Sequence, residues 1–136
     1  MEFAWLSLWQ PQLRALLRIV TALLYLQHPF IKLFGFPPGG QPGLQQVGSL
    51  LWIAGLIELV TGTLVLLGLF TRAAAFIAAG EMAVAYWMIH FPMGPFPALN
   101  MGELAALYCF VFLYLAAAGP GAWSVDGARF RSRMPR

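Results

Sequence analysis

The residues of this sequence that could do chemistry are a few ionisable side chains inside long apolar stretches. Arg18, Glu58 and Glu81 each lie well inside such a stretch. On insertion scales a charged group at the centre of a bilayer costs about 2.5–3.5 kcal/mol. Each of these groups must therefore pair, hydrogen-bond, face water or take up a proton. Side chains kept in such places at that cost are the candidates for function.

Helical spacing puts the polar residues of the first stretch on one face. His28 and Lys32 are four residues apart and are therefore neighbours on a helix surface. Arg18 and Lys32 are fourteen residues apart. At about 3.6 residues per turn they lie within about 40° of each other, with Tyr25 between them. We expect this polar stripe to face the interior of a helix bundle.

In the second stretch, Gly55 and Gly62 flank Glu58 on its own helix face. These glycines permit either a tight helix contact or room for a small ligand beside the carboxylate. Two structural roles compete with a functional one. Glu58 and Arg18 could form a buried ion pair that fixes helix packing, and Glu81 could be a protonated contact between helices.

Depth sorts the candidates into a deeper and an outer group, which together predict a polar cleft that opens outward, with Glu58 towards its floor. Glu81 and His90 are nine residues apart and point to opposite sides of a straight helix. The predicted lining consists of Arg18, His28, Lys32, Glu58, Asn100 and Glu103, with Tyr25, Glu81 and His90 as secondary candidates. Asn100 and Glu103 also have the spacing of an N-terminal capping box.

Metal chemistry has little support in the sequence. His28 and His90 occupy similar outer depths on different stretches and could ligate a haem iron, but nothing fixes their facing, and we do not favour a haem. The single cysteine, Cys109, excludes an intrachain disulfide and a CxxC redox pair, and a zinc site lacks thiolate ligands. We predict no metal site.

The elements that position these residues are membrane-spanning helices. The chain has 136 residues, of which 60% are hydrophobic and 10% charged, whereas soluble domains are nearer half apolar and a quarter charged. A helix needs about 20 mainly apolar residues to cross the hydrocarbon core. Four stretches qualify, at about 12–34, 49–70, 73–91 and 101–118, with a basic tail at 119–136. We expect an all-α, four-helix antiparallel transmembrane bundle forming one domain, with Pro29 kinking the first helix or ending it early.

Basic residues predict the orientation. Seven arginines lie at the N-terminal end, the middle turn and the tail, and only Lys32 falls on the opposite side. This distribution predicts that both termini are cytoplasmic and that the chain is a multi-pass protein of the cytoplasmic (inner) membrane. The arginines of the tail favour contact with lipid headgroups over a nucleic-acid site.

Several motifs carry a resemblance to a known family. The runs are RIVTALLYLQHPFIKLFGFP (Arg18–Pro37), GLIELVTGTLVLLGLFTRAAA (Gly55–Ala75), NMGELAALYCFVFLYLAAAGPG (Asn100–Gly121) and WSVD (Trp123–Asp126). In order and spacing they resemble the DoxX family, whose pattern includes G-x-x-E-x-x-x-G in the second span, a G-L-x-T-R turn and N-x-G-E before the fourth. The matching polar residues are Arg18, His28, Lys32, Glu58, Arg72, Asn100 and Glu103. Pro29 stands where the family usually has glycine, and Glu81 matches no family motif.

The resemblance implies a four-helix membrane bundle and an association with quinone-linked redox systems. We therefore expect a redox-associated accessory subunit that binds a quinone or a similar lipid-soluble molecule, with Lys32 or His28 hydrogen-bonding a quinone oxygen and Glu58 relaying protons. No redox centre is visible in the chain, so it would be at most a subunit of a quinone-linked oxidoreductase, working with a partner subunit or as a homo-oligomer. The alternatives are a non-catalytic scaffold or chaperone for membrane proteins and a small proton-coupled transporter using Glu58 and Glu81.

Overall fold

The computed structural model describes residues 3–133, and every regular element among them is a helix. The α-helices are α1 (Ala4–Ser7), α2 (Gln10–Phe34), α3 (Leu50–Leu67), α4 (Thr71–Ala85), α5 (Pro97–Asn100), α6 (Glu103–Ala118) and α7 (Val125–Ser132). After α4 the chain continues as a π-helix, η1 (Tyr86–His90), and a short 3-10 helix, η2 (Phe91–Met93). The predicted all-α fold is confirmed for this part of the chain.

Local sequence signals explain where the long helices begin and end. The Ser49 hydroxyl accepts a hydrogen bond of 3.2 Å from the Trp52 amide and so caps the start of α3. Helices α2 and α3 end at Gly35 and Gly68, both in the left-handed conformation that favours glycine. Helix α2 runs through Pro29 to Phe34, so the expectation that Pro29 ends it early is wrong. Packing against neighbouring helices can hold a helix together across a proline.

In the part of the chain that the structure describes, three helical segments are long and apolar enough to cross a membrane. They are α2, α3 and the continuous stretch Thr71–Met93, which joins α4 to η1 and η2. Helix α6 is apolar but shorter, with 16 residues. The observed segments agree with the predicted spans to within about three residues at each end, because hydropathy and turn residues mark both.

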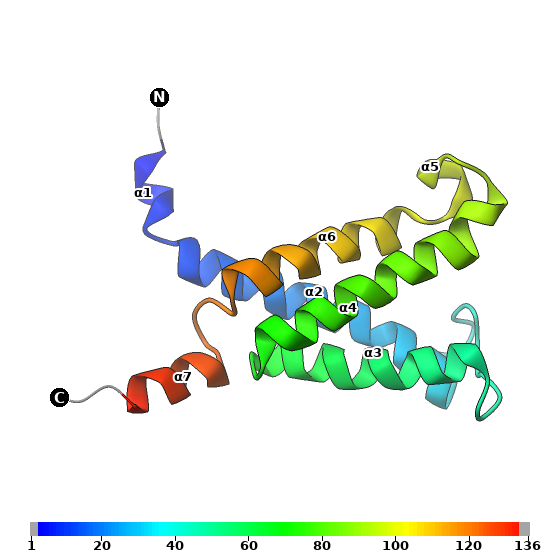
Figure 1. Ribbon diagram of the computed structural model, residues 1–136, viewed down its shortest axis with the longest axis horizontal. Coiled ribbons are helices and arrows are strands. Elements are labelled where there is room, and N and C mark those ends of the chain that lie inside the picture. The colour runs from blue at the N-terminus through cyan, green and yellow to red at the C-terminus, as the bar shows by residue number, and fades with distance from the viewer. Residues whose placement is uncertain (1–2, 134–136) are drawn as a thin grey trace.

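The long helices pair in sequence order. Helix α2 packs along α3, and α4 packs along α6, each pair running in opposite directions (Figure 1). Helices α3 and α4 are joined by a tight turn but contact each other less extensively than either pair does internally. Both α1 and α7 lie at one end of the bundle, the end of the α3–α4 turn, which we call the tail end (Figure 1).

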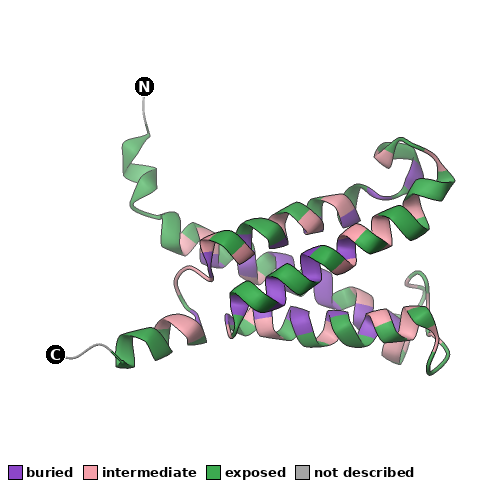
Figure 2. Ribbon diagram, in the orientation of Figure 1, coloured by how far each residue is buried: buried purple, intermediate pink, exposed green. Residues whose placement is uncertain are grey.

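Small residues of α4 form the centre of the core. Its buried face carries Ala74, Ala75, Ala78 and Ala79, which pack with aromatic and aliphatic side chains of α2 and α6. Alanines let the helix backbones approach closely. The faces of the long helices that point away from this core are exposed (Figure 2). They are apolar, as at Phe110 of α6, whose exposed fraction is 69%. A surface that is this apolar is suited to lipid.

Candidate functional site

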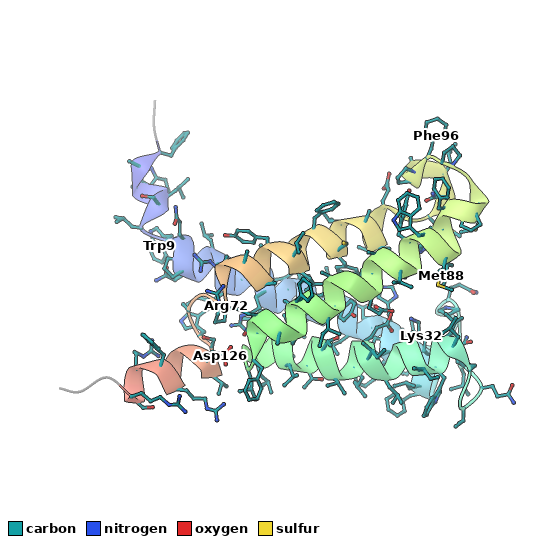
Figure 3. The ribbon with its side chains drawn as sticks, in the orientation of Figure 1. Trp9, Lys32, Arg72, Met88, Phe96 and Asp126 are labelled. Atoms are coloured by element: carbon teal, nitrogen blue, oxygen red, sulfur yellow. The ribbon has the colours of Figure 1, made fainter. Side chains whose placement is uncertain are left out.

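A groove between α3 and α4 combines apolar walls with two ionisable side chains. Its volume is about 380 Å³, within the range of ligand pockets. Apart from Lys32 and Glu81 its lining is apolar or glycine, and includes Ile53, Ile57, Ile77, Gly80, Val84 and Met88. Many of these residues belong to the exposed faces of their helices, so this α3–α4 groove is open at the side of the bundle. Lys32 and Met88 lie at the end of the molecule opposite Arg72 and Asp126 (Figure 3).

Lys32 lies on α2, lines the groove and forms a buried ion pair with Glu58 of α3. Its Nζ lies 2.6 Å from Oε1 of Glu58, and the exposed fractions of the two side chains are 10% and 1%. Gly55 makes this approach of α2 and α3 close, because a Cβ added to it would lie 3.2 Å from the Cβ of Lys32. Gly62, two turns further along α3, also lets α2 and α3 approach closely, because a Cβ added to it would lie 3.0 Å from the Tyr25 ring. The glycines therefore serve as close helix contacts.

Glu58 is only half satisfied by this pair. Among the described residues its second oxygen, Oε2, is buried and has no hydrogen-bond donor. A buried polar atom without a partner costs about 1–3 kcal/mol. The carboxylate therefore retains the capacity to accept a hydrogen bond from a hydroxyl or a water molecule.

The second carboxyl, Glu81, is held by a tyrosine. The Tyr25 hydroxyl donates a 3.2 Å hydrogen bond to Oε2 of Glu81. Tyr25 is wholly buried and packs edge-on against Tyr108 and Phe112, with ring centroids 5.5 and 4.8 Å away. The packed aromatic side chains fix the hydroxyl in position. Tyr25 and Glu81, which the sequence ranks as secondary, thus belong to the groove and its immediate support.

The outer polar residues form a different cluster. The His90 ring shares a 3.0 Å hydrogen bond between Nδ1 and the Asn100 carbonyl. The Asn100 side chain is buried, donates to the Gly94 carbonyl and accepts from the Gly102 amide, both at 2.8 Å. These bonds tie together the connection between η2 and α6. None of these residues lines the α3–α4 groove.

Glu103 and His28 also lie away from the groove. Glu103 is exposed at the first residue of α6, and the N-cap is Gly102, so the predicted capping box between Asn100 and Glu103 does not form. The chain turns at Asn100 and Met101 before α6 starts, which places Asn100 outside the cap position. His28 is half-buried beside Tyr108, with ring centroids 6.1 Å apart. The predicted cleft is therefore divided between separate places.

Arg18 lies at the tail end and does not pair with Glu58. Its guanidinium donates to five carbonyl oxygens, at distances of 2.5–3.2 Å, which belong to Val65, Leu66, Pro120, Ala122 and Trp123. The first two are carbonyls of the last turn of α3, and the others belong to the loop after α6. The suggested ion pair with Glu58 is wrong, because Lys32 occupies that position and the helix-end carbonyls satisfy the arginine.

The described residues contain no group of three His, Cys, Asp or Glu side chains arranged to hold a metal ion. His28 and His90 sit in the unrelated surroundings described above, one beside Tyr108 and the other bonded to a loop carbonyl.

Comparison with known proteins shows the family. The family model described as DoxX matches residues 13–91, which include most of α2 and all of α3, α4 and η1. The chain belongs to the DoxX family. It is also 42% identical over 130 residues to an uncharacterized protein of Haemophilus influenzae, covering 93% of this chain and 97% of that protein. No solved structure matches the chain.

The DoxX match contains the groove residues Lys32 and Glu81 and the ion-pair partner Glu58, whereas Asn100 and the tail lie outside it. Sequence reasoning missed two parts of the arrangement. Gly80 borders the groove beside Glu81, and its only signal was a glycine among alanines. Asp126, within the WSVD run, hydrogen-bonds the start of α4 and holds the tail to the bundle.

Proposed function

We propose that this DoxX protein is a four-span protein of the cytoplasmic (inner) membrane, forming one domain with both termini in the cytoplasm. Support comes from three segments of spanning length and from the apolar α6 packed beside α4. At 1.5 Å per residue α6 covers roughly 24 Å, close to the hydrocarbon thickness of about 30 Å. The arginines at the tail end agree with a cytoplasmic position. Reporter fusions test the topology: a fluorescent protein after residue 133 should fluoresce, and alkaline phosphatase inserted at Gly94 should be active.

Within that membrane, the protein binds a lipid-soluble small molecule with a polar head, of the quinone type, in the α3–α4 groove. One observation carries this proposal: within residues 3–133, Lys32 and Glu81 are the only ionisable groups that line a groove otherwise apolar and open at the side of the bundle. A ligand could enter such a groove from the lipid without crossing water. An apolar pocket with a few placed polar groups is the usual form of a small-molecule site.

The residues present fit a quinone. Lys32 Nζ can donate to a head-group oxygen, because it is held at the groove by Glu58. Glu81 also lines the groove and accepts a hydrogen bond from the Tyr25 hydroxyl, and both are groups that can hold a proton. Isoleucines of α3 and α4 offer walls for an apolar tail. A bound quinone would supply an acceptor of electrons and protons, and since the described residues hold no redox centre, a partner subunit would supply the electrons. The protein would then be an accessory subunit.

Filling the groove tests this proposal without removing a charge. A Cβ added at Gly80 would meet no atom within 4 Å, and Gly80 is exposed at the groove, so Gly80→Leu should fold normally and occupy the groove. Thr63→Leu is the matched control, because Thr63 is exposed on α3 and does not line the groove. Binding of ubiquinone-1 to protein in nanodiscs would be measured by equilibrium dialysis. Gly80→Leu should weaken binding at least tenfold and Thr63→Leu should not. Equal affinity for all three proteins would remove the proposal.

Lys32 gives a second test of the same site. Replacing a charged hydrogen-bond donor costs about 1.5–3 kcal/mol, so Lys32→Met should weaken ubiquinone-1 binding roughly 10- to 100-fold. Because Lys32→Met alone should destabilise the fold, ubiquinone-1 binding would be compared between wild type and the double variant Lys32→Met with Glu58→Leu, which should keep the fold.

A scaffold for partner membrane proteins is the second candidate, and the Lys32–Glu58 pair is the observation that favours it. That pair joins α2 to α3 and could serve folding alone. A scaffold would capture partner proteins normally with Gly80→Leu and would fail only where the fold is lost. The groove-filling variant therefore separates the two functions.

A further inference from the structure

The tail end of the bundle carries a second hollow, between α7 and the α3–α4 turn. Its volume is about 540 Å³, and its apolar walls come from Phe70, Ala73, Pro120 and Phe130, with Arg72 at its edge. The two phenylalanines are mostly exposed, at 59% and 64%. The hollow is thus an aromatic surface with a cationic border, and nothing in the proposed function uses it.

Hydrogen bonds from the tail hold α7 against the α3–α4 turn beside this hollow. The carboxylate of Asp126, in the first turn of α7, accepts hydrogen bonds of 2.9 Å from the Phe70 amide, the Thr71 amide and the Thr71 hydroxyl. The Asp126 amide donates in turn to the Gly68 carbonyl at 2.9 Å. These bonds place α7 against the turn. They also occupy the oxygens of the carboxylate, whose negative charge interacts with the nearby positive charge of Arg129.

The arginines at this end differ in what they still can bind. Arg14 and Arg18 donate to carbonyl oxygens at the ends of α6 and α3. Arg72 donates to the Ala116 and Ala117 carbonyls through Nη1 alone, and Nε and Nη2 make no hydrogen bond among the described residues. The guanidinium of Arg129 lies 5.6 Å from the centroid of the Phe70 ring and makes no other polar contact in the same range of residues. Arg72 and Arg129 therefore remain able to bind an anion beside the aromatic walls.

We propose that this hollow binds the head of an anionic phospholipid, with the phosphate on Arg72 and Arg129 and the glycerol and first methylenes on Phe70 and Phe130. Charge complementarity supports this occupant, since Arg131 and Arg133 add to the positive charge of Arg72 and Arg129 and outweigh the one carboxylate of Asp126. Depth supports it too, because Phe70, Phe130 and Trp123 are exposed aromatic side chains at the end of the bundle, as at a membrane–water interface. Basic pockets at this level are suited to anionic lipid heads. Only the assignment to the cytoplasmic leaflet rests on the topology proposed above.

Lipid competition on the full chain tests the site. Detergent-purified, delipidated protein is mixed with equal amounts of dioleoyl phosphatidylglycerol and dioleoyl phosphatidylcholine, and native mass spectrometry measures the ratio of the two bound lipids. Wild-type protein should retain phosphatidylglycerol preferentially. Arg129→Gln should lower the ratio roughly fivefold, the value of one basic residue near an anionic lipid surface. Arg131→Gln is the matched control, because it removes the same charge from the same helix, but Arg131 does not lie over the Phe70 wall of the hollow as Arg129 does.

A second variant leaves the charges unchanged. Ala73 is exposed and lines the hollow, so Ala73→Phe should fill it and lower the ratio while thermal stability stays normal. Equal effects of Arg129→Gln and Arg131→Gln would overturn the site and leave only general attraction by the tail. So would an unchanged ratio in Ala73→Phe. Displacement of the lipid by 10 mM inorganic phosphate would show a simple anion site and would also overturn the proposal. Ubiquinone-1 binding should remain normal in these variants, so failure here is distinct from failure of the α3–α4 groove.

Discussion

Breaking the Lys32–Glu58 pair should destabilise the protein strongly, whereas replacing both residues should not. The pair joins α2 to α3 over 2.6 Å, and Glu58 is almost completely buried. Removing one partner of a buried pair costs about 3–5 kcal/mol, because a charge remains without compensation. Removing both in favour of apolar side chains of similar volume is often neutral or stabilising.

The structure refines these magnitudes for each variant. In Lys32→Met the carboxylate keeps no described partner, since Oε2 already has none, so we expect a loss near the upper value, about 4 kcal/mol. In Glu58→Leu the lysine can turn into the α3–α4 groove, which it lines, so we expect a smaller loss of about 2 kcal/mol. The double variant Lys32→Met with Glu58→Leu should lie within about 1 kcal/mol of wild type. The sum of the two single losses then exceeds the double loss by about 5–7 kcal/mol, a non-additivity that shows the two side chains interact.

Reversible unfolding in mixed micelles, with increasing fractions of sodium dodecyl sulfate, would measure these differences through tryptophan fluorescence. Additive single effects would refute the reasoning, because they would mean that the two side chains do not interact energetically. An unchanged midpoint for Lys32→Met would refute it as well. The double variant also serves the binding test, since it keeps the fold and removes the proposed head-group donor.

Three further predictions concern the ends of the helices. Burial raises the pKa of Asp126, but the hydrogen bonds from Thr71 and Phe70 lower it by more, so the pKa lies below its ordinary value. The ionised carboxylate should therefore stabilise the fold above about pH 4, and this stability should be lost as the pH falls further. Asp126→Asn should remove this part of the pH dependence in thermal unfolding. Asp126→Asn should itself cost about 1 kcal/mol, the usual value of a helix cap. Arg18→Lys should lower the melting temperature markedly despite the retained charge, since an ammonium has three donors for the five carbonyl oxygens, and a melting temperature equal to wild type would contradict this role. Gly102→Ala should cost about 1–3 kcal/mol in micelle unfolding, because the new Cβ would lie 2.7 Å from Asn100 Oδ1, and an unaffected midpoint would mean that the loop adjusts freely.

The sequence determined the elements of this protein. Apolar stretches about as long as a bilayer is thick, separated by glycine and proline clusters, predicted the long helices to within a few residues, because hydrophobicity and turn chemistry are local properties. The expense of charge in lipid also singled out Lys32, Glu58 and Glu81 as side chains that need partners. Of the two effects expected of Pro29, an early end of α2 does not occur, since the packing that holds the helix together there is not a local property.

Only the tertiary structure decided which polar groups meet. Spacing along one helix gives the angle between its own residues, but it does not give the rotation of one helix against another. For that reason Arg18 and Lys32, which share a face of α2, could not be assigned to different partners in advance. For the same reason the α3–α4 groove could not be predicted. Its walls are ordinary apolar residues in the sequence, and only the placement of the two helices makes them line a groove with Lys32 and Glu81.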